Sequence, residues 1–346
     1  MAAKAQEQSP NRLKKAQDFG VQYAIYLVFV VLILVIAVKE PAFLSLNNFR
    51  NILTMSATRI IIAMGMGAIL ITGGVDLSAG RQVGLAAVLS ASMLQNLDYP
   101  RRMYPDMPIL PLLIPILVAM LACGIFGFLN GFFIAKLKLP AFIATLGSMV
   151  AVYGVNSLYF DRPPYGAQPI GGLDRRFSTL GSGYIGVNGL YSIPYIVIIA
   201  VVITLITYVL FNKTTYGKNI YAIGGNAEAA KVSGVNVNRT LILVYTIAGV
   251  LFGLGGTLEA ARTGGATNNY GNGYELDAIA ACVVGGVSNL GGIGTVPGIV
   301  IGVLIFSVIN YGLTFINMSP YWQQIVKGAI IIAAVALDIR KYLKKR

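Results

Sequence analysis

The sequence predicts an all-α polytopic membrane protein with about ten transmembrane helices, some of them broken or re-entrant, and with both termini in the cytoplasm. Of the 346 residues, 56% are hydrophobic and 11% are charged, whereas a soluble domain carries about 25% charged residues. Apolar segments long enough to cross about 30 Å of hydrocarbon recur along the chain. These observations exclude a soluble globular fold.

Ten apolar segments are long enough to cross the membrane as helices. Polar residues and glycines interrupt three of them, 50–72, 78–96 and 274–290, so we expect broken or re-entrant helices among these. The approximate limits of the ten segments are 20–38, 50–72, 78–96, 109–135, 139–160, 192–212, 240–261, 274–290, 294–316 and 321–339.

The basic residues lie mainly on one side of these segments. With both termini inside, 16 Lys and Arg residues fall in inner loops and tails and eight fall in outer segments. Arg59 and Lys327 fall within spans, where their side chains are expected to extend toward the membrane surface. Basic residues favour the cytoplasmic side. We therefore expect a cytoplasmic tail (1–19), a single transmembrane domain (20–340) and a basic cytoplasmic tail (341–346).

The composition argues against several functional classes. The chain contains no histidine, which excludes histidine-based catalysis and histidine metal ligands. Cys123 and Cys282 lie in apolar segments, so no metal site is expected. No Walker A motif occurs, and no soluble domain carries the net charge of +13. We expect neither a cofactor bound to this chain nor a nucleic-acid partner.

The one sizeable polar loop on the basic side spans 213–239. Asn226 suits the N-cap of a short helix, Glu228 suits the positive end of its dipole, and Gly234 suits its C-terminal stop. Two turns of helix span about 10 Å. A compact helix at the membrane surface predicts a docking element for a soluble partner.

Polar residues within the apolar segments are candidates for lining a passage or a gate. Asp76 lies in a Gly-rich break, where capping of the next helix is favoured and substrate contact is the alternative. Glu275 and Asp277 stand within one turn at the start of a span, where capping again competes with function. Glu259 and Arg262 have the spacing of an i,i+3 pair. The path or gate candidates are Asp76, Asn130, Asn268, Asn269, Glu275, Asp277 and Asn310.

Two patterns concern helix packing. G-x-x-x-G motifs, among them Gly127–Gly131 and Gly249–Gly253, predict close helix contacts. The segment 129–147 resembles 309–328 in its order of Asn, Gly, Pro and Gly, which indicates an internal repeat.

Three tracts, TGGVDLSAG, GKNIYAIGGNAEAAKVSGV and YELDAIAACVVGG, together resemble the sugar-type ABC importer permeases, the group of ribose, xylose and galactose permeases. The similarity covers nearly the whole chain from about residue 20. Within the group, LGSMVAVYGVNSLYF and YWQQIVKGAIIIAAVALD are most similar to the galactose/methyl-galactoside branch. The outer segment DRPPYG departs from the pattern of the group.

The resemblance implies a multi-pass permease of the bacterial inner membrane, in contact with membrane lipid. Two permease copies would sit above two copies of a sugar-type ATPase, which binds ATP and Mg, and a periplasmic sugar-binding protein would deliver the sugar. It also implies that the polar loop bears a coupling helix that enters a cleft on the ATPase. Ala230→Glu is then expected to abolish uptake without loss of insertion. By position, the coupling residues are Asn226, Glu228, Ala229, Ala230, Lys231 and Gly234.

The large loop on the predicted periplasmic side, 161–192, contains several prolines and glycines, which exclude a long regular element. Its charge suggests that it meets acidic lobes of the binding protein. The docking candidates are Arg162, Arg175 and Arg176.

The expected function is that of a non-enzymatic membrane subunit of an ATP-driven importer for a monosaccharide, with galactose or a methyl galactoside as the implied substrate. The alternative is an ion-coupled secondary sugar transporter that uses Asp76 or Glu275 for coupling. An intramembrane enzyme is a third class, and the absence of histidine and of a visible nucleophile–base pair counts against it.

Overall fold

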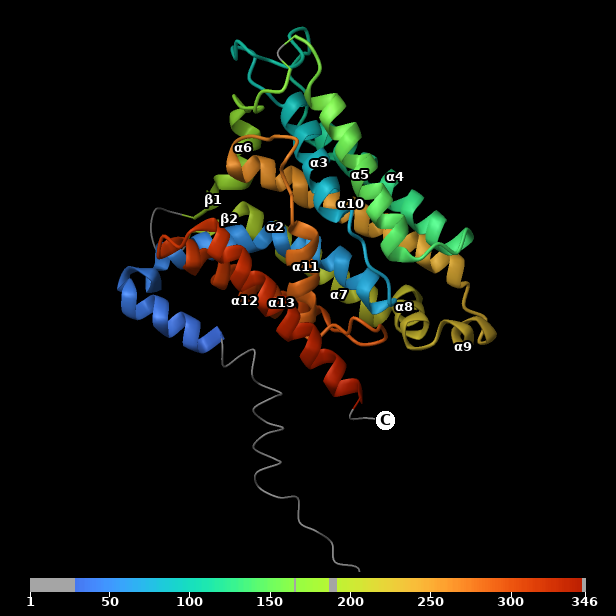
Figure 1. The fold of residues 1–346 in the computed structure, drawn as a ribbon. Coiled ribbons are helices and arrows are strands. Elements are labelled where there is room, and N and C mark those ends of the chain that lie inside the picture. The colour runs from blue at the N-terminus through green and yellow to red at the C-terminus, as the bar shows by residue number, and fades with distance from the viewer. Residues whose placement is uncertain (1–28, 165, 187–191, 344–346) are drawn as a thin grey trace, which may run out of the picture. The chain divides into compact units, whose positions relative to one another are not determined.

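The computed structural model describes residues 29–164, 166–186 and 192–343, and within them it is mostly helical (Figure 1). The chain divides into two compact units: Met1–Leu44 together with Val308–Arg346, and Ser45–Ser307. The predicted N-terminal tail lies outside the described residues, so the predicted domain limits stay a prediction.

The larger unit contains most of the helices and one short antiparallel ribbon, β1–β2. Its elements are α2 (Leu46–Ile71), α3 (Ala79–Met93), α4 (Leu113–Lys136), α5 (Ala141–Phe160), α6 (Arg175–Ser182), β1 (Tyr184–Ile185), β2 (Ile193–Pro194), α7 (Tyr195–Lys213), α8 (Thr215–Gly225), α9 (Ala227–Val232), α10 (Val237–Thr263), α11 (Tyr274–Val284) and most of α12 (Val296–Phe315). The smaller unit contains the apolar helix Phe29–Lys39, the 3-10 turn η1 (Pro41–Leu44), the end of α12 and α13 (Pro320–Leu343).

Six helices of the described residues are long and apolar enough to cross a membrane: α2, α4, α5, α7, α10 and α12. Their ends lie within a few residues of the predicted limits. Two predicted spans are not continuous helices. Helix α3 has 15 residues and α11 has 11, and at about 1.5 Å per residue neither reaches across the hydrocarbon. The prediction of full spans at 78–96 and 274–290 is therefore wrong, and the expectation of broken helices is confirmed there.

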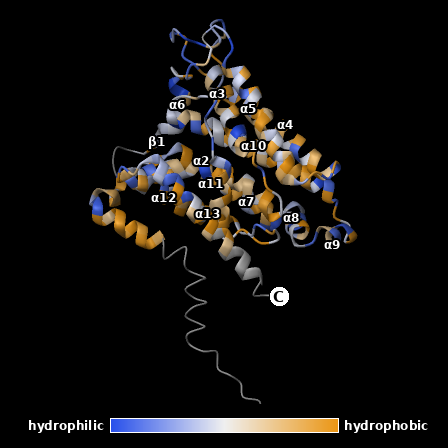
Figure 2. Cartoon of the chain, viewed as in Figure 1, coloured by the Kyte–Doolittle hydropathy of each residue, from blue (hydrophilic) through white to orange (hydrophobic). Residues whose placement is uncertain are grey.

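The apolar helices differ in how much of their surface other helices cover. In the most apolar stretch of α2, 78% of the residues are buried, whereas the share is 22% in both α5 and α7. Hydrophobic colours predominate along α4 and α5 in Figure 2, and large hydrophobic side chains of α4, α5 and α7 are exposed. Exposure of such large apolar surfaces to water is unfavourable, so α4, α5 and α7 are suited to face lipid, whereas α2 is suited to the protein interior.

Glycines allow α4 and α10 to pack with their backbones in contact. A Cβ atom at Gly127 would overlap the carbonyl oxygen of Tyr245, and one at Gly249 would overlap the carbonyl oxygen of Cys123. Both glycines belong to predicted G-x-x-x-G motifs, so those close contacts are confirmed. The inner face of α4 therefore packs closely along α10.

The short helix α3 begins near the middle of the bundle. Cys123, at the middle of α4, donates from Sγ to the carbonyl oxygen of Gln82 at 3.2 Å. The Gln82 side chain also faces Gly249, at the middle of α10. The first turn of α3 therefore lies at half the depth of the full-length helices, and α3 runs from there to the α6 side, where the amide of Asp174 donates to the carbonyl oxygen of Leu94 at 2.7 Å.

Helix α11 begins at the same depth and runs the opposite way. Cβ atoms at Gly80 and Gly84 would overlap the carbonyl oxygens of Gly271 and Tyr270, which immediately precede α11. The turn after α11 reaches the end of α2, where the amide of Gly292 donates to the carbonyl oxygen of Ile71 at 2.8 Å. Two half-length helices thus start side by side at mid-depth and point to opposite faces.

The two segments of the predicted internal repeat share one local feature. Lys138 and Asn317 both have a positive φ, 57° and 54° respectively. Each stands two or three residues before a proline, Pro140 or Pro320, at which α5 or α13 begins. Non-glycine residues rarely adopt this conformation. Because the two residues lie at different distances from their prolines, the repeat of 129–147 and 309–328 stays a prediction.

Candidate coupling and translocation sites

The predicted docking helix is present as α9, which is a capped element of six residues. The side chain of Asn226 accepts a hydrogen bond from the amide of Ala229 at 2.9 Å. Glu228 lies in the first turn and Lys231 in the last, so both charges suit the helix dipole. Gly234 follows with a φ of +87°, which a residue with a side chain adopts only at a cost. The predicted short helix at 226–234 is confirmed.

The exposed face of α9 differs from the predicted one. Ala230 is only 4% exposed, because it packs against the chain itself, whereas Val232 is 89% exposed. A glutamate at this position would meet the chain's own interior, so the expected loss of uptake in Ala230→Glu would not separate coupling from folding, and that expectation stays a prediction. Ala229 remains exposed. Val232 was missed, and its signal in the sequence is a lone branched apolar residue at the end of a polar loop helix.

Beneath α9, helix α8 contacts the ends of two other segments. The hydroxyl of Tyr221 donates to the carbonyl oxygen of Gly294 at 2.8 Å. A Cβ atom at Gly224 would overlap the carbonyl oxygen of Ile71, the last residue of α2, and the amide of Gly292. The docking helix is thus tied through α8 to α2 and to the turn between α11 and α12. We call this contact of Gly224, Ile71 and Gly292 the glycine junction.

Asp76 lies in a buried polar network, in which Gln82 Oε1 and Asn130 Oδ1 have no hydrogen-bond partner among the described residues. It is fully buried and accepts a hydrogen bond from the amide of Ser78 at 2.8 Å, at the start of α3. Asn130 and Gln82 donate to the hydroxyl of Ser78 at 3.0 and 2.8 Å. Tyr245 donates to the carbonyl oxygen of Val75 at 3.1 Å. The favoured interpretation of Asp76 as a residue that orders the start of a helix agrees with this geometry, and neither Asp76 nor Asn130 lines an open passage here.

Asp76→Ala is expected to destabilise the protein by about 1–3 kcal/mol for each buried donor left without an acceptor. Asp76→Asn retains one acceptor oxygen toward Ser78 and should lose less. The thermal unfolding midpoint in detergent measures both. A wild-type midpoint for Asp76→Ala together with loss of transport would instead place Asp76 on the path, as the ion-coupled alternative requires.

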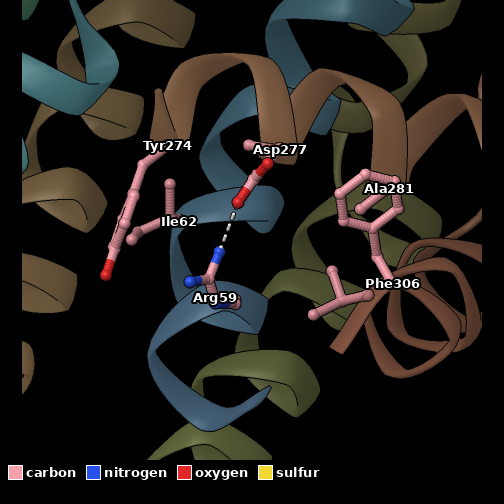
Figure 3. Close-up of a pocket in the computed structure, with 8 residues that line it drawn as sticks. Arg59, Ile62, Tyr274, Asp277, Ala281 and Phe306 are labelled. Carbon is pink, nitrogen blue, oxygen red and sulfur yellow. Dashed lines mark hydrogen bonds and ion pairs between the residues drawn. The ribbon is translucent and has the colours of Figure 1, made fainter. Parts of the chain in front are cut away.

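A second buried network contains four charges. Arg59 Nη1 lies 2.7 Å from Asp277 Oδ2 (Figure 3), and its guanidinium stacks 4.5 Å from the centre of the Tyr274 ring. Arg262 pairs with Glu259 at 2.7 Å, which confirms the predicted i,i+3 pair. Tyr274 joins the two pairs, because its hydroxyl donates to Glu259 at 2.8 Å.

This four-charge network corrects the expectation for Arg59. Its side chain does not extend toward the membrane surface but turns to Asp277, on an element 218 residues away in sequence. Two positive and two negative charges balance, as buried ionic groups require. Asp277 is therefore held in an ion pair beside a small pocket, which Arg59, Ile62, Tyr274, Asp277, Ala278, Ala281, Val303 and Phe306 line.

The remaining path candidates of the larger unit gather at the start of α11. Asn268 donates to the hydroxyl of Ser157 at 3.2 Å. Asn269 accepts from Arg81 at 3.4 Å. Glu275 packs against Gly80. Asn310 belongs to the smaller unit, where it is 6% exposed and its side-chain amide has no hydrogen-bond partner among the described residues.

Two of the three outer arginines are engaged within the chain. Arg162 stacks 4.6 Å from the centre of the Tyr104 ring and donates to that hydroxyl at 2.8 Å. Arg176 pairs with Asp174 at 2.6 Å, and its hydrogen bond holds the pKa of Asp174 below the usual value. Asp174 also caps α6. Arg175 is exposed and is the docking candidate best placed to meet a partner.

The fold and these sites define an integral membrane protein of the transport class, with a short capped helix on one face and polar groups at mid-depth. Among the described residues, no cluster of three or more His, Cys, Asp or Glu has the arrangement of a metal site. The chain belongs to the family described as branched-chain amino acid transport system / permease component, which matches residues 48–335.

Curated relatives are similar over nearly the whole chain. The galactose/methyl galactoside import permease protein MglC of Haemophilus influenzae is 53% identical over 338 residues, which are 97% of this chain and 100% of that protein. Its counterpart in Escherichia coli K12 is 54% identical over 322 residues, 93% and 95% of the two chains. The ribose import permease protein RbsC of Bacillus subtilis is 36% identical over 339 residues, 97% and 98% of the two chains. No solved structure matches the chain.

The resemblance found in the sequence is therefore confirmed. The two galactose permeases are more similar to this chain than the ribose permease is, as the tracts in α5 and α13 predicted. The chain is a transport subunit rather than an enzyme, because permeases of this family carry substrates across membranes.

Proposed function

We propose that this chain is the membrane-spanning permease subunit of an ATP-driven importer for galactose or a methyl galactoside in the bacterial inner membrane. The observation that carries the proposal is the identity of 53–54% with two galactose/methyl galactoside permeases over nearly the full chain. The chain forms the path for the sugar and binds no cofactor of its own. ATP and Mg bind to a separate sugar-type ATPase.

The proposed topology has ten passes with both termini in the cytoplasm. Six are the long apolar helices, and the first and last passes are the predicted span 20–38 and α13. The other two are composite, because α3 and α11 each cross half of the membrane and the chain segments 72–78 and 264–273 complete the crossing. The excess of basic residues on the α9 side supports this orientation.

In the assembled importer, α9 enters a cleft on the ATPase. Exposure of Ala229 and Val232 supports this contact, because the two present a small and a branched apolar surface on an otherwise polar loop. Motion of the ATPase then reaches α2 and α11 through α8 and the glycine junction. Because α4, α5 and α7 face lipid, a second copy of the chain packs against a different face, the one where α3 and α11 begin. The sugar path then lies between the two copies.

A periplasmic sugar-binding protein delivers the sugar to the α6 side. The exposed guanidinium of Arg175 on α6 supports contact with an acidic lobe, since complementary charge speeds association. Arg162 and Arg176 take a structural part in holding the outer loop.

Reconstitution tests the proposal. The chain, its ATPase and its binding protein in proteoliposomes are expected to accumulate radiolabelled galactose with ATP and without an ion gradient. Uptake driven by an imposed proton or sodium gradient without the ATPase would instead establish the ion-coupled alternative.

Val232→Asp tests the coupling surface. The charged side chain must be desolvated in an apolar cleft, so ATP-driven uptake should fall at least about tenfold, while the variant remains inserted. Val232→Ile keeps the apolar surface and serves as the matched control with near-normal uptake. Co-purification of the ATPase reports the contact directly, and wild-type recovery of the ATPase with Val232→Asp would contradict the assignment.

A further inference from the structure

The polar residues at the start of α11 form a cluster that the networks of Asp76 and Arg59 do not include. Arg81 Nη2 donates to Asn272 Oδ1 at 3.0 Å and Nη1 donates to Asn269 Oδ1 at 3.4 Å. The guanidinium also stacks 4.4 Å from the centre of the Tyr153 ring. Glu275 lies beside Gly80, one residue from Arg81. Helices α3, α5 and α11 and the segment 264–273 all contribute.

The depth of this cluster is inconsistent with a lipid-facing surface. Arg81 precedes Gln82, whose carbonyl oxygen lies beside the middle of α4. At that depth Asn269 and Asn272 are exposed. Exposed amides and a guanidinium in hydrocarbon cost several kcal/mol, and such groups in membrane proteins face a protein partner or a water-filled cavity. A water-filled path satisfies them.

The cluster also holds unused hydrogen-bonding capacity. Glu275 is 8% exposed and its Oε2 has no hydrogen-bond partner in the described chain; Asn156, 1% exposed, has the same vacancy at Oδ1. The side-chain oxygens of Asn269 and Asn272 both accept from Arg81. The side-chain nitrogen of neither asparagine donates a hydrogen bond within the described part of the chain. Buried polar atoms without a partner are few in native proteins, and the described chain has others besides these two. What sets this cluster apart is that the vacant oxygens occur together with exposed amides, which a ligand or water can reach.

We propose that Arg81, Asn269, Asn272 and Glu275 form a transit subsite for a neutral, polyhydroxylated ligand at the middle of the path. This inference rests on the proposed function and identifies where the sugar is contacted. One positive and one negative charge cancel, so the subsite has no net preference for an ion. Amide nitrogens donate to sugar oxygens and the carboxylate accepts from sugar hydroxyls, which is the paired donor and acceptor pattern that a pyranose requires.

Cysteine accessibility tests the water-filled position. The native Cys123 and Cys282 are fully buried, so they provide a low background. Asn272→Cys is expected to react with a membrane-impermeant thiol reagent in the assembled importer, and excess galactose with ATP should slow the reaction. Leu205→Cys, on the lipid-facing surface of α7, is the control that stays unlabelled. Equal absence of labelling at both positions would overturn the subsite.

Transport by the reconstituted importer tests the ligand contact. Asn272→Leu and Asn272→Asp both remove the amide donor, and Asn272→Asp keeps an oxygen for Arg81. Both are expected to lower galactose uptake per ATP hydrolysed by about tenfold, as loss of one or two hydrogen bonds predicts. If the wild-type importer moves galactose and both variants keep its ratio of galactose uptake to ATP hydrolysis, the subsite alone is overturned. Absence of ATP-driven galactose uptake by the wild type would overturn the proposed function itself.

Discussion

Gly224→Ala is expected to abolish ATP-driven uptake while the chain still inserts into the membrane. The added methyl group would overlap the carbonyl oxygen of Ile71 and the amide of Gly292. Both groups belong to the backbone and cannot rotate away, so the overlap is removed only if α8 moves away from α2 and from the turn before α12. Overpacking of this kind costs about 1–3 kcal/mol. The larger consequence is that motion of α9 no longer reaches the two half-length helices.

The neighbouring glycine is a matched control. A Cβ atom at Gly225 would have no neighbour within 4 Å, so Gly225→Ala adds the same methyl group at the next residue without a clash. Uptake and ATP hydrolysis are measured together in proteoliposomes. We expect Gly224→Ala to hydrolyse ATP without uptake and Gly225→Ala to do both. Equal uptake by the two variants would show that the glycine junction transmits nothing.

Arg59→Met is expected to destabilise the protein by about 3–5 kcal/mol, because it leaves the Asp277 carboxylate buried without the guanidinium. The thermal unfolding midpoint and the yield of monodisperse protein measure the effect. Arg101→Met is the control, since Arg101 is exposed in a loop and surface substitutions usually change stability by less than about 0.5 kcal/mol.

The double variant Arg59→Met with Asp277→Asn separates loss of a pair from loss of packing. Removing the second charge should recover a substantial part of the stability lost in Arg59→Met, because the carboxylate that lost its guanidinium partner is no longer charged. The single variant Asp277→Asn completes the comparison. If the stability lost by the double variant equals the sum of the losses in the two single variants, the ion pair is not the source of the effect. Lost contacts of the Arg59 stem and the Tyr274 ring would then account for it.

Features set by neighbouring residues were predictable from the sequence. The cap at Asn226 and the stop at Gly234 depend on contacts within three or four residues, and both are present. The limits of the long helices also followed, because continuous apolar length is itself the requirement for crossing a membrane.

Features set by distant contacts were not predictable. Arg59 meets Asp277 across 218 residues, and nothing in either local sequence identifies the partner. The early end of α11 was missed although two glycines follow Val284, because glycines also occur inside continuous helices of this chain, as in α10. The burial of Ala230 was missed because a six-residue helix is too short for its buried face to be read from periodicity.

The four-charge network of Arg59, Asp277, Glu259 and Arg262 has a consequence for an energised membrane. A membrane potential acts on a net charge with about 2.3 kcal/mol per elementary charge for each 100 mV. The network carries two charges of each sign on α2, α10 and α11. When these helices move together, the work done by the field on each positive charge offsets the work on its negative partner. Movement of this network should therefore be insensitive to the membrane potential, so that the electrical state of the cell neither drives nor opposes the displacement of its four charges.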